Sequence, residues 1–373
     1  MTLWLRRAAL IAVLLGAPAC ALFDAEAVSV LRDIEAGDRP SDLKAATPPP
    51  RVEPLSWRLG DRRMIGDLYI PGEPPAAALL LTPGLSPDGK DDRRLQALAR
   101  SFARAQFLTL TPEIPGSRSM RFSPDDAAAI GAALQALDAQ VRARRTPQRI
   151  GAAAISYAVG PAIFSALDHD PDDALDFLIA LGGYHDARAV LAFVTTDRVR
   201  DPRSGGWGRR DAHPLGRWFL ARSLAGEVSD AADRAALTAW ADAGMANPRM
   251  PPAPPAGLGA EGASVLALVQ NRDPNAIAQL VAAAPRSVRR GVDALSPAAR
   301  DLAPLAGKLI LIHGEEDRVT PPEESVALAA RVPDTDLFLV PTFSHIELRE
   351  VSLDGKRVLA EAMVEILQRR DGG

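Results

Sequence analysis

The chain has 373 residues, of which 47% are hydrophobic and 24% are charged, and its formal net charge at pH 7 is −4. This composition is typical of a globular protein, and the length suffices for one large α/β domain with an insertion or for two domains. The slightly acidic balance offers no electrostatic basis for binding nucleic acid, so no nucleic-acid partner is expected.

The first twenty residues differ from the rest of the chain. Arg6 and Arg7 precede an apolar run over residues 8–16, and the small residues Ala17-Pro18-Ala19 follow. This order is typical of a secretory signal peptide, and the apolar run is too short to span a bilayer. Residues 1–19 are therefore predicted to be a signal peptide, and the mature protein is expected in the periplasm or cell envelope.

Cys20, the only cysteine of the chain, comes directly after that small-residue site. It resembles the lipidated cysteine of bacterial lipoproteins, which implies a lipid anchor and a membrane as partner. The alternative is cleavage after Ala19 with Cys20 as an unmodified passenger. Without a second cysteine the mature chain forms no internal disulfide.

Residues 20–50 contain a short helical pattern, Ala25 to Ala36, and end in Pro48-Pro49-Pro50. Proline-rich segments act as semi-rigid spacers. The segment is therefore predicted to be a tether that holds a domain away from a membrane surface.

After residue 50, short apolar segments alternate with segments of helical spacing. Strands are predicted at 55–59, 64–70, 76–81, 107–110, 150–155, 177–181, 308–312 and 337–340. Helices are predicted at 95–105, 124–144, 157–167, 322–331 and 355–368. Gly60-Asp61 between the first two strands indicates a hairpin. The alternation predicts an α/β fold with a mostly parallel sheet and helices on both faces, built from residues 51–195 and 301–373.

Residues 196–300 interrupt this alternation with mostly helical spacing and a proline-rich joint at 251–255. The segment is predicted to be a helical cap inserted between two strands, over the carboxyl ends of the sheet where ligands bind. Its tryptophans, Trp207, Trp218 and Trp240, either line a substrate pocket or pack the cap.

Ser156 follows the strand 150–155 directly and precedes a helix, which is the strand–turn–helix context of a nucleophile elbow. The elbow is usually G-x-S-x-G, whereas Ala154 and Ala158 stand at the glycine positions here. The alternative is a small polar residue in an alanine-rich turn.

An acidic loop and a histidine follow two later strands. The loop H-G-E-E-D-R-V-T-P starts at His313 and offers three acids, Glu315, Glu316 and Asp317, any of which could orient a catalytic histidine or form a solvated turn. His345 lies past the last predicted strand, in a loop that can reach back to Ser156.

The chain order of serine, acid and histidine, each after a separate strand, resembles the α/β-hydrolase family. The resemblance covers about residues 55–368 outside the cap, and its most specific part is the acid loop, which is similar to the family's H-G-x-x-D-x-V-x-P. That similarity selects Asp317 over its glutamate neighbours and implies a structural role for His313. It implies a catalytic triad of Ser156, Asp317 and His345.

An oxyanion hole would need two backbone N–H donors. The resemblance implies the amide of Tyr157 and that of Leu85, in the loop after strand 76–81, where Pro83-Gly84 replaces the His-Gly of many family members. Tyr184 and His185 end another strand and are possible substrate-lining residues.

These features predict a serine hydrolase at the cell envelope that cleaves a carboxylic ester of a small-molecule acyl substrate through an acyl-enzyme. No zinc site is expected, because the five histidines show no H-x-x-x-H or H-E-x-x-H spacing, and with no glycine-rich phosphate loop in the sequence no cofactor is expected. Two alternatives remain, namely an amide or peptide hydrolase with the same triad and a non-catalytic binding protein that retains the fold. The sequence does not predict the oligomeric state.

Overall fold

The computed structural model describes residues 24–146, 149–170, 173–250, 252–345 and 351–373. Its main sheet has eight strands within these ranges, in the spatial order β1-β2-β4-β3-β5-β6-β9-β10. Their bounds are Arg51–Leu59 (β1), Arg62–Ile70 (β2), Ala77–Thr82 (β3), Phe107–Pro112 (β4), Ile150–Ile155 (β5), Phe177–Leu181 (β6), Leu309–Gly314 (β9) and Asp336–Val340 (β10). β2 is antiparallel to both β1 and β4, and all other neighbours are parallel.

The central strands are apolar on both faces because each face packs against helices. In β3, Ala78 and Leu80 belong to one buried cluster, whereas Ala77, Leu79 and Leu81 belong to the cluster on the other side of the sheet. Successive side chains of a strand point to opposite faces. A continuous apolar run is therefore the expected sequence of a doubly covered strand.

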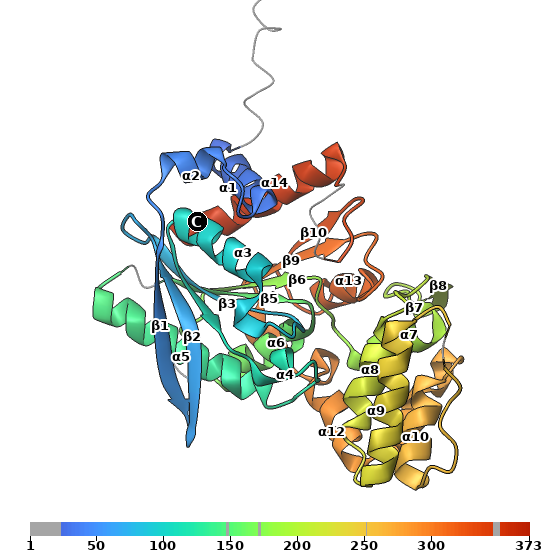
Figure 1. Ribbon diagram of the computed structural model, residues 1–373. Helices are drawn as coiled ribbons and strands as arrows, with labels where there is room; N and C mark the ends of the chain where they lie inside the picture. Colours follow the sequence, from blue (N-terminus) through green and yellow to red (C-terminus); the bar gives the residue numbers. More distant parts are fainter. Residues whose placement is uncertain (1–23, 147–148, 171–172, 251, 346–350) are drawn as a thin grey trace, which may run out of the picture.

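Helices cover both faces of the sheet (Figure 1). On one face lie α1 (Ala25–Ala36), α3 (Arg93–Arg104) and α14 (Leu353–Asp371). On the other face lie α5 (Asp126–Arg144), α6 (Val159–Asp168) and α13 (Glu323–Ala329). This arrangement confirms the predicted α/β fold with a mostly parallel sheet. Among the described residues, no helix is both long and apolar enough to cross a membrane.

The predicted hairpin is also confirmed. Leu59 pairs with Arg62 across a two-residue connection, Gly60-Asp61, and Gly60 has a φ of +56°. Glycine adopts this left-handed conformation without the steric cost that a side chain would impose.

The predicted tether over 20–50 does not hold for the described part of that segment. α1 packs its buried Ala27 and Val30 into the cluster that also contains α3 and α14. Asp33 of α1 is 1% exposed and bonds to the hydroxyl of Ser101 at 2.6 Å and to Nζ of Lys44, on α2 (Asp42–Ala46), at 2.5 Å. The segment is thus part of the folded domain. Cys20 and the predicted signal peptide lie outside the described residues.

The inserted segment forms a lobe beside the sheet (Figure 1). It contains α7 (Ala187–Thr196), α8 (Gly216–Ala225), α9 (Ala231–Ala246), α10 (Ala260–Val269), α11 (Ile277–Ala283) and α12 (Arg286–Ala294), and a small two-stranded sheet of β7 (Arg198–Arg200) and β8 (Trp207–Arg209). Its core includes residues of α7, so the lobe begins before residue 196, where the cap was predicted to start. Trp218 and Trp240 pack edge-to-face in that core with ring centroids 5.0 Å apart, which favours the packing interpretation of these tryptophans.

Candidate active site

Ser156 sits in a tight turn between β5 and α6. Its φ of +54° is unusual for a residue with a side chain, and the turn continues as a short 3₁₀ helix, Ser156–Ala158. Ala154 and Ala158 are each 1% exposed and belong to the core cluster beneath the turn. The methyl groups at the two usual glycine positions are therefore accommodated in the core.

The structure brings Ser156, His345 and Asp317 together from three loops. His345 Nε2 lies 2.7 Å from Ser156 Oγ, and His345 Nδ1 lies 2.6 Å from Asp317 Oδ2. Since a carboxylate can only accept, Nδ1 carries the proton and Nε2 is left to accept the serine hydroxyl hydrogen. Glu315 and Glu316 are exposed, so of the three acids in the loop Asp317 is the one placed on the histidine.

Asp317 is completely buried, yet the structure favours its ionised form. Its Oδ1 accepts hydrogen bonds from the backbone N–H groups of Val319 (2.7 Å) and Thr320 (3.0 Å). Burial alone would raise the pKa of Asp317, but hydrogen bonds from His313 and His345 outweigh it and hold the pKa well below its usual range. The carboxylate is therefore available as the negative partner of His345.

His313 is a second histidine on the same carboxylate. It is buried at the end of β9, with Nε2 2.9 Å from the carbonyl oxygen of Thr320 and 3.3 Å from Asp317 Oδ2. Nδ1 lies 2.7 Å from the hydroxyl of Ser325 on α13. Because the Thr320 carbonyl can only accept, Nε2 carries the proton and Nδ1 accepts from Ser325. His313 thus holds the acid loop from behind, consistent with the structural role that the resemblance implied.

Leu85, one predicted oxyanion donor, lies in the loop after β3 beside the nucleophile. A Cβ placed on Gly84 would lie 3.1 Å from the carbonyl oxygen of Ile155 and 3.4 Å from Ser156 Cβ, so glycine permits this close approach. The carbonyl of Gly84 accepts a hydrogen bond from the buried hydroxyl of Ser117. In a trans peptide this leaves the Leu85 N–H on the side away from Ser117. That N–H has no acceptor among the described residues.

Tyr157, the other predicted donor, is fixed through its side chain. Its hydroxyl oxygen accepts from the N–H of Ser123 at 2.7 Å and lies 3.1 Å from Asp126 Oδ2. Asp126 Oδ1 accepts from the N–H of Gly116, next to Ser117 on the short helix α4 (Pro115–Arg118). Burial raises the pKa of Asp126 to about 6. One polar network therefore connects the residues that position both predicted donors.

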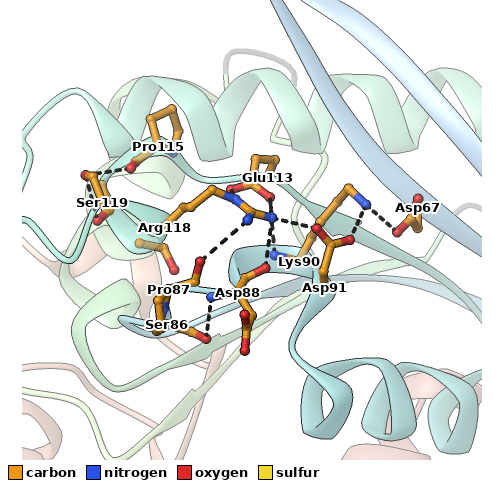
Figure 2. Close-up of polar contacts among 12 residues, drawn as sticks. Asp67, Ser86, Pro87, Asp88, Lys90, Asp91, Glu113, Pro115, Arg118 and Ser119 are labelled. Atoms are coloured by element: carbon orange, nitrogen blue, oxygen red, sulfur yellow. Dashed lines mark hydrogen bonds and ion pairs between the residues drawn. The ribbon is translucent and has the colours of Figure 1, made fainter.

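A charged network anchors the rest of the loop that carries Leu85 (Figure 2). Lys90 Nζ lies 2.8 Å from Asp67 Oδ2 on β2 and 2.7 Å from Asp91 Oδ1. Arg118 of α4 pairs with Asp91 at 2.6 Å and with Glu113 at 2.7 Å. These contacts tie the loop to β2 and to the segment after β4, which limits its freedom to move.

A cavity of about 620 Å³ opens above Ser156, between the sheet and the cap. Ser156, Leu85, Tyr157 and Tyr184 all line it. His185 does not. Its backbone N–H donates to buried Glu324 at 3.0 Å, and burial lowers the pKa of its imidazole. Of the two residues predicted to line the site, only Tyr184 does so.

Within the described part of the chain, no group of three or more histidine, cysteine, aspartate or glutamate side chains is placed to hold a metal ion.

Sequence reasoning missed the supporting residues Ser117, Asp126 and Ser325. None of them lies in a recognisable motif. Each acts through a contact between segments that are distant in the chain, such as the 33 positions that separate Ser117 from Gly84. The only local signal was the histidine of the acid loop, whose partner Ser325 follows twelve positions later.

We compared the chain with family models, curated proteins and solved structures to identify its fold. No family model matches the chain, and no curated protein matches it at a significant level. Among solved structures, lipase A of Candida antarctica in its closed state is 12% identical, with a TM-score of 0.52 over 89% of this chain and 80% of that one. A thermostable carboxylesterase cloned from a metagenomic library is 13% identical, with a TM-score of 0.49 over 91% and 95% of the two chains.

An acylaminoacyl peptidase of Pyrococcus horikoshii is 13% identical, with a TM-score of 0.47 over 87% of this chain. The alignment spans only 42% of the peptidase, so this chain corresponds to less than half of that protein. At these identities the similarity establishes architecture. The chain has the α/β-hydrolase fold, as the likeness to the lipase shows.

Proposed function

We propose that this protein is a serine hydrolase that cleaves a carboxylic ester through a covalent acyl-enzyme. The observation that carries the proposal is the continuous line of hydrogen bonds from Ser156 Oγ through His345 to Asp317, with distances of 2.7 and 2.6 Å. A fold does not determine a reaction, but a buried carboxylate, an imidazole and a serine in this geometry are the parts that acyl transfer requires.

In the first half of the reaction, the Ser156 oxygen attacks the ester carbonyl carbon while His345 Nε2 accepts the serine proton. The N–H groups of Leu85 and Tyr157 bind the oxyanion of the tetrahedral intermediate. Asp317 holds the imidazole in its Nδ1–H form and stabilises the imidazolium that results. The intermediate collapses when His345 returns the proton to the leaving alcohol, and the acyl group stays on Ser156.

In the second half, His345 accepts a proton from a water molecule, whose oxygen attacks the acyl carbon. A second tetrahedral intermediate forms at the same oxyanion donors. Its collapse breaks the bond to Ser156 Oγ, which takes the proton back from His345 and releases the carboxylic acid.

The lining of the cavity supports an ester with an apolar acyl group over a peptide. Recognition of a peptide uses backbone hydrogen bonds, as when an extended segment pairs with a sheet edge. The cavity is lined mostly by aliphatic and aromatic side chains of the cap and core, including Phe122, Leu191, Phe219 and Val292. Amide cleavage by the same triad and ligand binding without catalysis are the alternatives that the experiment must separate.

We also propose that the protein acts at the cell envelope, held by a lipid on Cys20. The support is in the sequence, where Arg6 and Arg7, an apolar run and small residues precede Cys20. Asp24, which caps the first helix, lies four positions after that cysteine. A lipidated Cys20 would therefore join the folded domain to the membrane through a very short link.

Labelling with a fluorophosphonate, followed by intact mass and peptide mapping, tests the nucleophile. We expect one adduct on Ser156 in the wild type and in Ser264→Ala, a variant of a cap serine on α10. We expect none in Ser156→Ala, with kcat for p-nitrophenyl esters reduced by several orders of magnitude. Unchanged turnover in Ser156→Ala would contradict the assignment.

Matched p-nitrophenyl esters and p-nitroanilides of the same acyl group then separate ester from amide cleavage. Hydrolysis of the ester alone supports the proposal, and comparable turnover of the anilide supports the amide alternative. A folded protein with neither labelling nor turnover would support the binding alternative.

A further inference from the structure

The cavity above Ser156 extends well beyond the reacting groups. Its volume of about 620 Å³ lies in the middle of the roughly 300–1,000 Å³ that small-molecule sites occupy. The catalytic serine and the predicted oxyanion donors form one end of it, and cap helices form most of the remainder. The shape of this remainder constrains the acyl group that the site accepts.

Two cap helices each present one face to the cavity. On α7 the lining residues are Ala187, Val190, Leu191 and Val194, a spacing of three, one and three that places them on a single face. On α8 the lining residues run from Gly216 to Leu224 with the same periodicity, and Glu227 follows just past the end of the helix. The lining positions extend about 10 Å along each of these helices, so this part of the cavity is elongated, and we call it the trough.

The length of this trough can be derived from α12, which runs along it. At its C-terminal end, the carbonyl of Leu295 lies 3.2 Å from a Cβ placed on Gly160, one turn beyond Ser156. At its other end, Ser287 Oγ donates to the carbonyl of Glu227 at 3.3 Å, so it meets the end of α8. Ser287 and Leu295 both line the cavity. A helix rises about 1.5 Å per residue, so the trough runs roughly 12 Å along α12.

The far end of the trough is polar. Glu227 lines it there, and its carboxylate pairs with Arg121 at 2.7 Å. An alkyl chain that reached this pair would desolvate two charged side chains, which is unfavourable. The charged pair therefore sets an outer limit for an apolar substrate.

We propose that the acyl group is an unbranched aliphatic chain of about ten carbons, bound along α7, α8 and α12. An extended alkyl chain advances roughly 1.25 Å per carbon–carbon bond, which follows from a bond length of about 1.5 Å, so 12 Å holds about that number of carbons. The inference rests on the proposed ester hydrolysis because it names the substrate of the same site.

Gly291 is the position of this trough at which an added side chain would shorten it. It lines the cavity near the middle of the trough-facing side of α12, and a Cβ placed on it has no heavy atom within 4 Å. A side chain at this position therefore enters open space without a clash in the protein. Gly291→Phe would fill the trough beyond its middle and leave room for a short acyl group only. Arg286→Phe, on the same helix at a position outside the cavity lining, adds the same ring elsewhere.

The test is kcat/KM for p-nitrophenyl esters of two, six, ten and fourteen carbons with the wild type and both variants. For the wild type we expect kcat/KM to rise with chain length up to ten carbons, by at most about threefold to fourfold per methylene, and not beyond. Gly291→Phe should lose at least tenfold on the ten-carbon ester, with the acetate ester within about twofold. Arg286→Phe should follow the wild type.

A flat chain-length profile in the wild type would overturn the proposal, as would a Gly291→Phe variant that slows the acetate and ten-carbon esters equally. Failure of the proposed hydrolysis has a different signature, namely no turnover of any ester and no fluorophosphonate adduct. Calorimetric binding of decanoate to Ser156→Ala, compared with Ser156→Ala/Gly291→Phe, tests the trough in that case too. Loss of decanoate binding in the double variant supports the trough, and equal binding overturns it.

Discussion

Asp317 shows how a single residue decides the chemistry of the loop around it. Its neighbours Glu315 and Glu316 carry the same charge but are exposed, whereas Asp317 is buried and lies 2.6 Å from His345 Nδ1. Two backbone amides and two histidines donate to it, and these contacts stabilise the ionised carboxylate. Asp317 can therefore orient His345 because its carboxylate is buried beside the imidazole. The negative charge of the neighbouring glutamates does not contribute to this contact.

Asp317→Asn should reduce kcat for ester hydrolysis by about 10⁴, because an amide no longer enforces the Nδ1–H form of His345. Glu316→Gln should leave kcat within about twofold, since its side chain faces solvent. Steady-state kinetics with a short-chain p-nitrophenyl ester measure both. Equal losses in the two variants would mean that the acid has been misassigned.

Glu324 is an acid whose environment disfavours its charge. It is 5% exposed at the start of α13, and its Oε2 accepts from the backbone N–H groups of Asp186 (2.8 Å) and His185 (3.0 Å). Burial raises the pKa of Glu324 to about 7 although these hydrogen bonds lower it. In the unfolded chain a glutamate titrates near about 4.3. The stability that this group contributes is thus fully present below about pH 4.3 and is lost as the pH rises through about 7.

Glu324→Gln keeps an acceptor for both amides and removes the charge. We expect the free energy of unfolding of the variant to exceed that of the wild type at pH 8, by at most about 4 kcal/mol, and to approach it near pH 4.5. Denaturant unfolding at several pH values measures the difference, with Glu361→Gln, an exposed position on α14, as the control. Parallel curves for Glu324→Gln and the wild type would show that Glu324 is not held in its neutral form.

At the scale of elements, the loop that carries Leu85, a proposed oxyanion donor, depends on a helix that carries none of the proposed catalytic groups. α4 supplies Ser117, whose hydroxyl bonds to the Gly84 carbonyl and whose carbonyl accepts from the N–H of Ser86 at 3.3 Å. Both contacts fix the peptides on either side of Leu85. α4 itself is fixed through Gly116 and Asp126 to Tyr157.

Ser117→Ala should therefore lower kcat more than it changes KM, because the oxyanion forms only in the transition state. We expect a loss of about tenfold or more in kcat, less than the 10² to 10³ that follows removal of a donor. Ser119→Ala, at the exposed end of the same helix, is the matched control. A loss confined to stability, with kcat and KM unchanged in the folded enzyme, would assign Ser117 a purely structural role.

Elements that are encoded locally could be predicted, and contacts between distant elements could not. β5, Ser156 and α6 are consecutive in the chain, so the sequence shows the strand–turn–helix context of the elbow directly. The acid loop and His345 are needed as well to favour a nucleophile over a small polar residue in a turn. The hydrogen bonds of Ser117 to Gly84 and of Ser325 to His313 join separate elements. They depend on how these elements pack in three dimensions, which no local pattern in the sequence predicts. The helical pattern of residues 25–36 was visible, but its small apolar face gave no sign that it docks onto α14.

At the scale of the whole molecule, the proposed catalytic groups and most of the cavity lining come from different layers. The carboxyl ends of β3, β5 and β9 and the loop after β10 bring the reacting atoms together, as parallel sheets generally do. The cap adds the walls of the cavity. The face of the sheet covered by α1, α3 and α14 contributes to neither (Figure 1). Attachment of the chain near α1 would therefore leave the cavity free.

That separation predicts the effect of Cys20→Ser. If a lipid on Cys20 holds the protein, the variant should move from the membrane fraction to the soluble fraction of the cell envelope, because a serine cannot carry the thioether-linked lipid. Since α1 and α14 lie away from the cap and none of their residues lines the cavity, kcat/KM for a soluble short-chain ester should stay within about twofold of the wild type. Fractionation with immunodetection and esterase assays on both fractions measure the two effects. Persistent membrane association of Cys20→Ser would contradict the lipid anchor, and a large loss of kcat/KM in the released protein would contradict the independence of anchor and site.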